Sequence, residues 1–465
     1  MKPITRFAER PYVIDLDPAV VWDSVCGCLK DCARWAGSEK VACITTTSQR
    51  FATAIIGKMG ETKAICPNVD ARGAEVNDIL FECMGDEAFK ITGHYPPFLF
   101  SAYRLMWFKE FQPDVFAGIR HVTSLDGWLY HKMTGSPAEE ASQAAGTFLF
   151  DISKRRWSNE ICELLGVELG WLPRLVDYGD FVGYPTDELQ SLTGIGPRTQ
   201  VVMGAGDTHC SGMGSSAFSA GQAYISMGST APIHVIMSNP LTDKAKRMWT
   251  GCFPIDGQWV LESNLGMCGV VYEWLASSVL RATTQGNVDH DLFDKLASSA
   301  PSCSKDVLAF LGPSIMDAKA FTRISPSAII LPSLLVGEKP GVAEIARACY
   351  EDIAYACRGN IEQMEEVCPN IDFRVRTAGG LARSGLVLQI LADVLKRPVL
   401  VPVERRASVI GGAVAAISFL DSKNPKQVIS DLVELNEIKP SGDSTLYDLS
   451  YRRWRLIYDK LGGLM

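Results

Sequence analysis

The sequence predicts an α/β protein with more than one domain, and three observations lead to this expectation. The chain has 465 residues, more than one ordinary domain holds, so two or three domains are expected. Apolar extended runs alternate with segments of helical spacing, which is the order of an α/β layer. Several of the extended runs end in glycine-rich turns, which can direct backbone N–H groups toward an anion.

Composition narrows the class of ligand. The hydrophobic fraction is 47% and the charged fraction 21%, as in soluble globular proteins. The 45 Lys and Arg residues against 53 Asp and Glu residues give a net charge of −8. This balance argues against nucleic acid or an anionic membrane as the main partner. We find no apolar run of about 18 residues and no apolar leader, so we expect a cytoplasmic protein without a membrane span.

Fourteen cysteines are expected to be free thiols, because a reducing compartment disfavours disulfides. Cys26, Cys28 and Cys32 lie close together in one helical segment and could suggest a metal site. The sequence contains no Cys-x-x-Cys pair, so small buried hydrophobes are the favoured interpretation.

The elements follow from the apolar pattern and the turn residues. The best marked helix start is Asp17 as N-cap with Pro18 behind it. Strands are expected at 4–7, 12–14, 41–44, 52–56, 121–125, 199–203, 223–227, 233–236, 373–377 and 398–403. Helices are expected from 18, around 105–108, at 341–367, from 384 and at 410–420. A Ser/Gly/Ala-rich junction at 215–221 divides the domains, and the chain from Pro425 onward is expected to be a peripheral tail.

The common phosphate and metal motifs are missing. The sequence has no G-x-x-x-x-G-K-[ST], no G-x-G-x-x-G after a strand and no H-E-x-x-H. The first glycine-rich turn, at 204–209, contains Asp207, which could accept a proton from an attacking hydroxyl. The alternative is that Asp207 or Thr208 merely caps the next helix. His209 is a rival base, although a lone histidine is more often a core or surface residue.

Two further turns could bind phosphate or a flat ring. Gly228, Ser229 and Thr230 could hold phosphate oxygens, with a generic β-turn as the alternative. Gly379 and Gly380 permit close approach of a ring, with an ordinary strand-to-helix turn as the alternative. Ser384 can cap the following helix.

The order and spacing of these turns resemble the FGGY carbohydrate-kinase family. The matching pieces are 204–209 (GAGDTH), 225–230 (ISMGST), 379–384 (GGLARS), 389–398 (QILADVLKRP) and 411–413 (GGA). The segment 101–110 is similar to one family signature, with Arg104 where Lys is usual. Residues 347–364 are loosely similar to a second signature, with Asp352 in place of Gly.

This resemblance implies two actin-like ATPase (ribonuclease H-like) domains around a central cleft. We expect a sugar-binding N-terminal domain at 1–216 and an ATP-binding C-terminal domain at 217–465. By position, Asp207 matches the general base. The phosphate turn matches Gly228, Ser229 and Thr230, and the adenosine turn matches Gly379, Gly380 and Ser384. Gly269 and, more weakly, Glu273 align with positions beside the nucleotide.

Substrate contacts are implied for the first half of the chain, at Gln49, Arg50, Asn68 and Asp70. Glycerol kinases carry Gln-Arg-Glu-Thr where residues 49–52 read Gln-Arg-Phe-Ala, and xylulokinases carry Gln-Met-His. The segment 66–72 (CPNVDAR) is closest to the autoinducer-2 kinase version. Asp70 could contact a sugar or brace the loop through Arg72.

The family begins with a strand hairpin bearing Asp-x-Gly-Thr/Ser, and the sequence lacks it. We therefore expect an N-terminally truncated first domain with an unpaired sheet edge and a weakened electrostatic clamp on the phosphates. The expected activity is phosphorylation of a sugar or polyol hydroxyl, with an autoinducer-2-like or pentulose-like substrate, ATP and Mg²⁺, and the family allows a homodimer. The alternatives are a catalytically inactive homologue that binds ligand and regulates a partner, and a chaperone-like ATPase.

Overall fold

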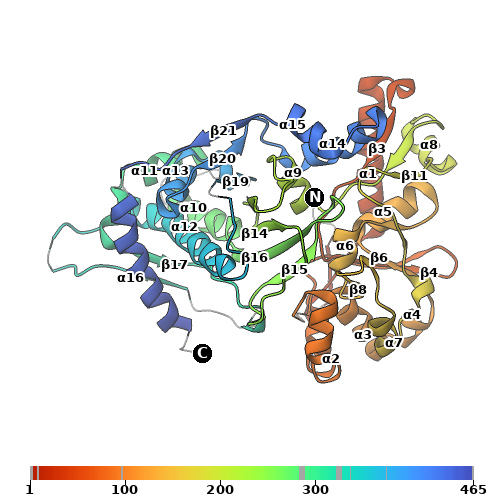
Figure 1. Cartoon of the computed structure of the whole chain (residues 1–465), viewed down its shortest axis with the longest axis horizontal. Coiled ribbons are helices and arrows are strands. Elements are labelled where there is room, and N and C mark those ends of the chain that lie inside the picture. The colour runs from red at the N-terminus through yellow and green to blue at the C-terminus, as the bar shows by residue number, and fades with distance from the viewer. Residues whose placement is uncertain are drawn as a thin grey trace. The chain divides into compact units, whose positions relative to one another are not determined.

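The computed structural model describes residues 4–7, 10–95, 98–281, 289–320, 327–335, 337–372, 374–442 and 444–462. The chain divides into two compact units (Figure 1). The first consists of Met1–Gly214, Ser238–Val260 and Ser408–Leu432, and the second of Ser215–Met237, Leu261–Ala407 and Val433–Met465.

The sequence-based domains 1–216 and 217–465 change over close to Ser215, but they differ from the units in two segments. Ser238–Val260 and Ser408–Leu432 come from the second half of the chain and pack in the first unit. The second of these segments holds most of α14, and Gly411 explains its close packing. A Cβ at Gly411 would lie 2.1 Å from the carbonyl oxygen of Cys210, in the same unit. Such long-range packing is not visible in a local pattern.

The first unit is built from short strands and the helices that connect them. Its strands are β1 (Ile4–Phe7), β2 (Arg10–Leu16), β3 (Cys43–Thr45), β4 (Thr53–Gly57), β5 (Thr62–Cys66), β6 (Ile119–Thr123), β7 (Ala138–Glu139), β8 (Phe150–Asp151), β9 (Arg156–Trp157), β10 (Arg174–Leu175), β11 (Phe181–Gly183), β12 (Gln200–Val202) and β15 (Trp249–Cys252). Its helices are α1 (Pro18–Ala36), α2 (Asn77–Thr92), α3 (Ser101–Phe111), α4 (Pro113–Ala117), α5 (Leu125–Thr134), α6 (Ala141–Ala145), α7 (Asn159–Leu165), α8 (Asp187–Thr193), α9 (Asp207–Met213), α14 (Ala407–Asp421) and α15 (Pro425–Leu432).

Two three-stranded sheets position the first unit's functional segments. Their strand orders are β11-β12-β3 and β5-β4-β6. β12 and β3 run parallel, with Val201 opposite Ile44, so the segments that follow both strands leave the sheet at the same edge. Among the described strands, β3 pairs with β12 alone and lies at the edge of its sheet.

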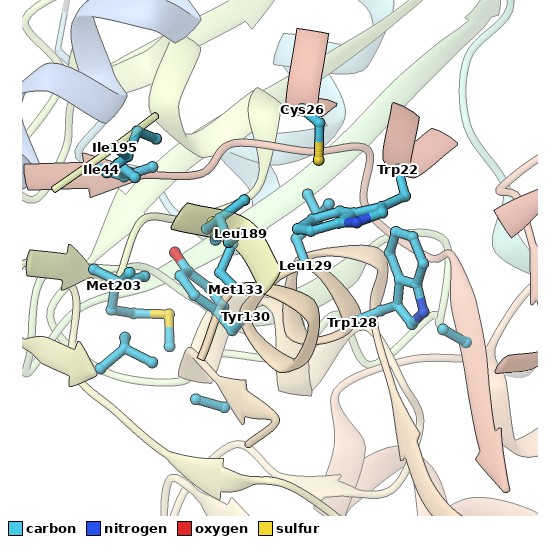
Figure 2. Close-up of a cluster of buried hydrophobic side chains, with 14 of the residues drawn as sticks. Trp22, Cys26, Ile44, Trp128, Leu129, Tyr130, Met133, Leu189, Ile195 and Met203 are labelled. Atoms are coloured by element: carbon cyan, nitrogen blue, oxygen red, sulfur yellow. The ribbon is translucent and has the colours of Figure 1, made fainter. Parts of the chain in front are cut away.

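The core of the first unit lies between these sheets and the helices α1, α5 and α8. Figure 2 shows Trp22 of α1 beside Trp128 of α5, with Leu129, Met133 and Leu189 close by. The two tryptophan rings meet edge to face at 6.3 Å. The predicted helix start is confirmed, because the Asp17 carboxylate accepts hydrogen bonds from the N–H groups of Ala19 and Val20.

The second unit is a twisted sheet with long helices. Six of its described strands are neighbours in the order β16-β14-β13-β19-β20-β21, and β17 pairs with β18 in a separate two-stranded sheet. The strands are β13 (Ala223–Ser226), β14 (Thr230–Met237), β16 (Trp259–Met267), β17 (Leu308–Phe310), β18 (Ala328–Ile330), β19 (Val375–Ala378), β20 (Val399–Pro402) and β21 (Leu435–Ile438). The helices are α10 (Gly269–Arg281), α11 (His290–Ser298), α12 (Val342–Val367), α13 (Gly385–Leu395) and α16 (Ser444–Gly462).

The expectation of a peripheral tail from Pro425 is wrong. β21 pairs antiparallel with β20, and α16 packs on α12 and α13 (Figure 1). Trp454 of α16 is fully buried, and its indole N–H donates to Asp352 at 2.9 Å and to the carbonyl of Ala309 at 3.2 Å. The many polar residues of α16 concealed one apolar face, which α12, α13 and the 3-10 helix Ser302–Asp306 cover.

Two further expectations concern cysteines and membranes. The expectation of buried cysteines is confirmed for Cys26 and wrong for Cys28 and Cys32, which are exposed, and the cysteines in the described ranges are free thiols. No helix within the described residues combines the length and the apolar character needed to cross a bilayer.

Candidate active site

The glycine-rich turn between β12 and α9 holds Asp207 at the first position of α9. The Asp207 N–H donates to the carbonyl of Ser48 at 2.8 Å. One carboxylate oxygen of Asp207 accepts from the N–H and the hydroxyl of Thr208, at 2.7 and 3.1 Å. Asp207 is exposed as a residue, although the surrounding protein removes water from its carboxylate.

The glycines of this turn bring Asp207 against the predicted substrate segment. A Cβ at Gly204 would lie 1.9 Å from the carbonyl oxygen of Thr46, and one at Gly206 would lie 2.7 Å from Cγ of Arg50. Both contacts are closer than any side chain tolerates, so the turn requires glycine at these positions. The structure therefore brings Asp207 and Arg50 together, and Gln49 lies partly exposed beside them in the sequence.

The environment of Asp207 favours a basic carboxylate. Removal of water by the surrounding protein raises its pKa, and the nearby Arg50 charge and the Thr208 hydrogen bonds oppose this shift. His209, the rival base, is buried, and its ring meets Phe253 edge to face. The histidine therefore fits a core role better than a catalytic one.

A second carboxylate, which the sequence analysis did not select, lies in the same unit. Asp126 follows β6 near the start of α5 and is buried. One of its oxygens accepts from the amide of Gln143 at 2.7 Å, and the other has no hydrogen-bond partner among the described residues. Burial raises the pKa of Asp126 to about 6, and the negative charge of Asp207 contributes to this shift.

Gln143 connects Asp126 to the glycine-rich turn before Asp207. A Cβ at Gly206 would lie 3.3 Å from the amide carbon of Gln143, so this side chain touches the turn before Asp207. Asp126 could have been found from the sequence, because it follows a predicted strand as Asp207 does. Gln143 had no such signal, since it lies on the short helix α6.

Asp70 was predicted either to contact substrate or to brace its loop. It is fully buried, and its hydrogen bonds brace the loop. Its carboxylate accepts from the N–H of Ile14 at 2.7 Å, from Arg72 Nε at 2.9 and 3.0 Å, and from Arg104 Nε at 3.2 Å. These bonds occupy both oxygens, so this geometry favours bracing. Asn68 is exposed on the same loop and remains a candidate for contact with substrate.

Arg104, which stands where the resembling signature carries Lys, ties two segments of this unit together. It is fully buried. Its guanidinium donates to the carbonyl of Phe51, to the hydroxyl of Thr53 at 3.1 Å, and to the carbonyls of Pro67 and Asp70 at 2.7 and 3.1 Å. A lysine has one donor centre and could not make this set of contacts.

In the second unit, the predicted phosphate and adenosine turns meet at the ends of parallel strands. β13 and β19 are paired with Ser226 opposite Ala378. Gly379 has a left-handed φ of +113°, and a Cβ there would lie 2.4 Å from the carbonyl oxygen of Met227. The turns at Gly228 and Gly379 are therefore neighbours in one unit, as a single nucleotide site would require.

Gly269 is packed against the phosphate turn. Its N–H donates to the carbonyl of Gly228 at 3.2 Å, and the N–H of Cys268 donates to the carbonyl of Ser229 at 3.1 Å. Gly228, Ser229 and Thr230 are exposed, so this turn is open to a ligand. These hydrogen bonds from the start of α10 hold the backbone of the turn in place.

Ser384 and Glu273 have local partners. The Ser384 hydroxyl accepts from the N–H of Val387 at 3.2 Å and caps α13, as the sequence predicts. Gly380 is exposed next to it. Glu273 lies on the surface of α10 and pairs with His290 at 3.4 Å. Because Glu273 is exposed and already paired with His290, its assignment to a position beside the nucleotide stays weak.

The donor set contains no ready-made metal cage. Within the described parts of the chain, no group of three or more His, Cys, Asp or Glu side chains could hold a metal ion. Magnesium typically binds through one or two carboxylates together with substrate phosphates. A single exposed carboxylate such as Asp207 fits an ion that arrives with a nucleotide.

Two family models match successive parts of the chain. The N-terminal domain of the FGGY family of carbohydrate kinases matches residues 2–214, and the C-terminal domain of the same family matches residues 223–419.

Individual relatives and structures are similar over most of the chain. An autoinducer-2 kinase of Klebsiella pneumoniae is 27% identical over 87% of this chain and 78% of its own length. A ligand-bound xylulose kinase of Lactobacillus acidophilus superimposes with a TM-score of 0.86 at 18% identity, covering 100% of this chain and 93% of the other. A glycerol kinase of Plasmodium falciparum with ADP superimposes with a TM-score of 0.84 at 17% identity, covering 99% of this chain and 92% of the other.

Proposed function

Since this chain belongs to the FGGY family of carbohydrate kinases, we propose that Asp207 is its general base in the transfer of the γ-phosphate of Mg·ATP to a sugar hydroxyl. The observation that carries the assignment is the packing of the turn before Asp207 onto Thr46 and Arg50. This packing joins the only exposed carboxylate of the turn to a segment of polar side chains. The chain and the xylulose and glycerol kinases that it superimposes on share the two-domain actin-like ATPase fold.

The acceptor is proposed to be a pentulose-like sugar or the autoinducer-2 precursor. Similarity to an autoinducer-2 kinase in sequence supports this class, and similarity to a xylulose kinase in fold is compatible with it. Gln49, Arg50 and Asn68 are the proposed contacts with its hydroxyls. Asp70 supports their segment through Arg72 and Arg104 and does not itself touch the sugar in this proposal.

In the reaction, the Asp207 carboxylate accepts the proton of the acceptor hydroxyl. The hydroxyl oxygen forms a bond to the γ-phosphorus, while the bond between that phosphorus and the β,γ-bridging oxygen breaks and ADP leaves. The raised pKa of Asp207 makes it a stronger base than an ordinary aspartate. The charge of Arg50, beside the same turn, opposes this rise in the pKa of Asp207.

The nucleotide is proposed to bind the second unit. Gly228, Ser229 and Thr230 would hold its phosphates through exposed amides and hydroxyls, and Gly269 would fix that turn. Gly379 and Gly380 would accept the adenosine, because residues without a Cβ let a flat ring approach the backbone. Ser384 would keep α13 in register behind them. Magnesium would arrive as part of Mg·ATP, with the phosphates as its main ligands.

The setting of the enzyme is part of the same proposal. We place it in the cytoplasm, with no nucleic acid or membrane as partner, in accord with its net charge of −8 and its free thiols. A homodimer is compatible with the family.

The test is ADP release in a coupled assay with Mg·ATP, across pentuloses, polyols and the autoinducer-2 precursor. Asp207→Asn should lower kcat by a factor on the order of 10² to 10⁴ and leave ADP affinity unchanged, since the nucleotide residues lie in the other unit. Asp187→Asn is the matched control, because Asp187 also begins a helix of the first unit and is exposed. Unaltered turnover in Asp207→Asn would refute the assignment. Binding of sugar and ATP without any turnover in the parent protein would instead support the inactive homologue.

A further inference from the structure

Phe51, the residue after Arg50, has an unusual backbone conformation. Its φ is +61°, in the left-handed region that bulky side chains rarely adopt. Such a conformation persists only where the surroundings determine it, and it is most frequent at functional sites. The position of this ring therefore needs an explanation from its contacts.

Several contacts fix the peptide and the ring of Phe51. Its carbonyl accepts a hydrogen bond from the buried guanidinium of Arg104. Its ring packs edge to face on Phe100 and Trp249, with centroid distances of 5.5 and 5.7 Å. Gly146 leaves room for the ring, since a Cβ there would lie 3.0 Å from Phe51 Cδ1. Phe51 is thus held as a rigid element and has little freedom to turn away.

The ring is also next to the acceptor site. The Arg50 guanidinium lies 4.6 Å from the centroid of the Phe51 ring, and Arg50 packs on Gly206, the residue before Asp207. Gly146 touches both the Phe51 ring and the carbonyl of Gln143. Phe51 is only partly buried, and its neighbours Arg50 and Gly146 contact Gly206 and Gln143 respectively.

An aromatic ring in this place offers no hydrogen bond to a sugar hydroxyl. A hydroxyl pressed against it would lose its bonds to water without replacement, whereas a C–H face or a methyl group would gain contact area. An apolar surface therefore disfavours a hydroxyl only moderately, because the hydroxyl loses hydrogen bonds to water that the ring does not replace. The ring is therefore expected to favour substrates that place a C–H face or a methyl group against it.

We propose that Phe51 is a specificity-determining residue that selects an acceptor with a carbon-bound hydrogen face or a methyl group at the position it covers, in place of a hydroxyl. This inference rests on the proposed kinase function and narrows its substrate class to deoxygenated or apolar-faced ketoses. Arg104 acts on this preference through the Phe51 peptide and is a positioning residue.

The experiment compares matched acceptors that differ by one hydroxyl, such as D-xylulose and 1-deoxy-D-xylulose together with analogues deoxygenated at the other non-reacting carbons. We expect at least one deoxy analogue to have a kcat/KM about ten-fold above its parent, a difference of 1.4 kcal/mol. Phe51→Gln should cancel or reverse that ratio by supplying a hydrogen-bonding side chain. Phe51→Leu should keep its direction.

Phe148→Leu is the matched control. Phe148 has a left-handed φ of +66° and stacks on Phe100 at 5.7 Å, but its ring is fully buried. It tests the packing of the aromatic cluster without changing the exposed surface, so the ratio should not move. An unchanged ratio in Phe51→Gln, or an equal shift in Phe148→Leu, would overturn the inference.

Binding measurements separate this inference from the proposed function. Calorimetric titration of each acceptor into Asp207→Asn should give the same preference in Kd, because Asp207 acts on the proton and Phe51 on the contact. Acceptors that bind with this preference but are never phosphorylated would refute the kinase function and leave the inference standing. Equal affinity for every hydroxylated and deoxy pair, or no binding of any acceptor, would overturn it.

Discussion

Gly269 lies directly against Gly228, so close that a Cβ at residue 269 would be 2.4 Å from the Gly228 carbonyl oxygen and 3.0 Å from its carbon. Their backbones are also joined by a hydrogen bond of 3.2 Å. The first residue of α10 therefore packs directly on the exposed turn between β13 and β14, and any side chain at 269 must displace the turn.

Gly269→Ala should accordingly weaken nucleotide binding. Because backbone atoms oppose the new methyl group, the turn at 228–230 must shift, and we expect KM for ATP to rise about ten-fold or more with little change in KM for the sugar. Gly385→Ala is the control, since a Cβ there meets nothing within 4 Å. Steady-state kinetics with each substrate varied gives the answer, and an unchanged KM for ATP would contradict the proposed phosphate turn.

The pH dependence of kcat/KM should reveal Asp207. A base must be ionised, so activity is retained above its folded pKa and lost as the pH falls through it. Desolvation raises that pKa above the ordinary 3.8, so the acid limb should lie at a higher pH than an ordinary aspartate gives.

Asp126→Asn should move this acid limb to lower pH. The two carboxylates repel each other, so removing one charge lowers the pKa of the other, and asparagine still offers an oxygen to the Gln143 amide. A pH–rate profile from about pH 4.5 to 8 measures the shift. If the acid limb of the pH–rate profile does not shift while the protein remains folded, the charge of Asp126 does not influence the pKa of Asp207.

Arg104→Lys should impair sugar binding more than nucleotide binding. Losing the guanidinium releases the carbonyls of Phe51 and Pro67 and leaves Asp70 short of one buried partner. We expect KM for the sugar to rise about ten-fold and unfolding free energy to fall by about 3 kcal/mol, as for a broken buried ion pair. Arg34→Lys, at a position 68% exposed, is the control for both readouts. A rise in KM for ATP alone would be the contrary result.

Trp454→Ala tests the role of the C-terminal helix. The indole is fully buried, stacks on Tyr458 and Phe310 at 4.8 and 5.7 Å, and bonds to Asp352. Its loss should lower the free energy of unfolding by about 3–5 kcal/mol in urea titrations. Leu456→Ala on the same helix, 59% exposed, should change it by less than about 0.5 kcal/mol. Similar losses in both variants would argue against the buried contact.

Local signals in the sequence predicted much of the fold. Asp17 and Pro18 marked the start of α1, and the hairpin of β13 and β14 has Ile225 opposite Ile233, as the two predicted runs suggested. Apolar spacing predicted α12 almost to the residue, at 341–367 against Val342–Val367. The prediction of a peripheral tail failed because the apolar face of α16 is interrupted by polar residues, and only the fold shows that α12 and α13 cover it.

Parts of the candidate site could also be predicted. The glycine-rich turns and Asp207 were recognisable because they follow strands, and parallel strands bring such turns to one edge of a sheet. Gln143 could not be recognised, since nothing in its own segment signals a functional residue. Asp70 remained undecided until Arg72 and Arg104 were seen to occupy its oxygens.

The sequence by itself determined the α/β class, the element order and the turns that we propose to carry the chemistry, because these depend on short-range spacing and backbone geometry. Only the tertiary structure decided that 238–260 and 408–432 join the first unit, that Asp126 lies near Asp207, and that Phe51 is fixed beside Arg50. The physical reason is that burial and electrostatic contact depend on which distant segments meet in space, and a linear pattern records only the tendency of each segment to be buried.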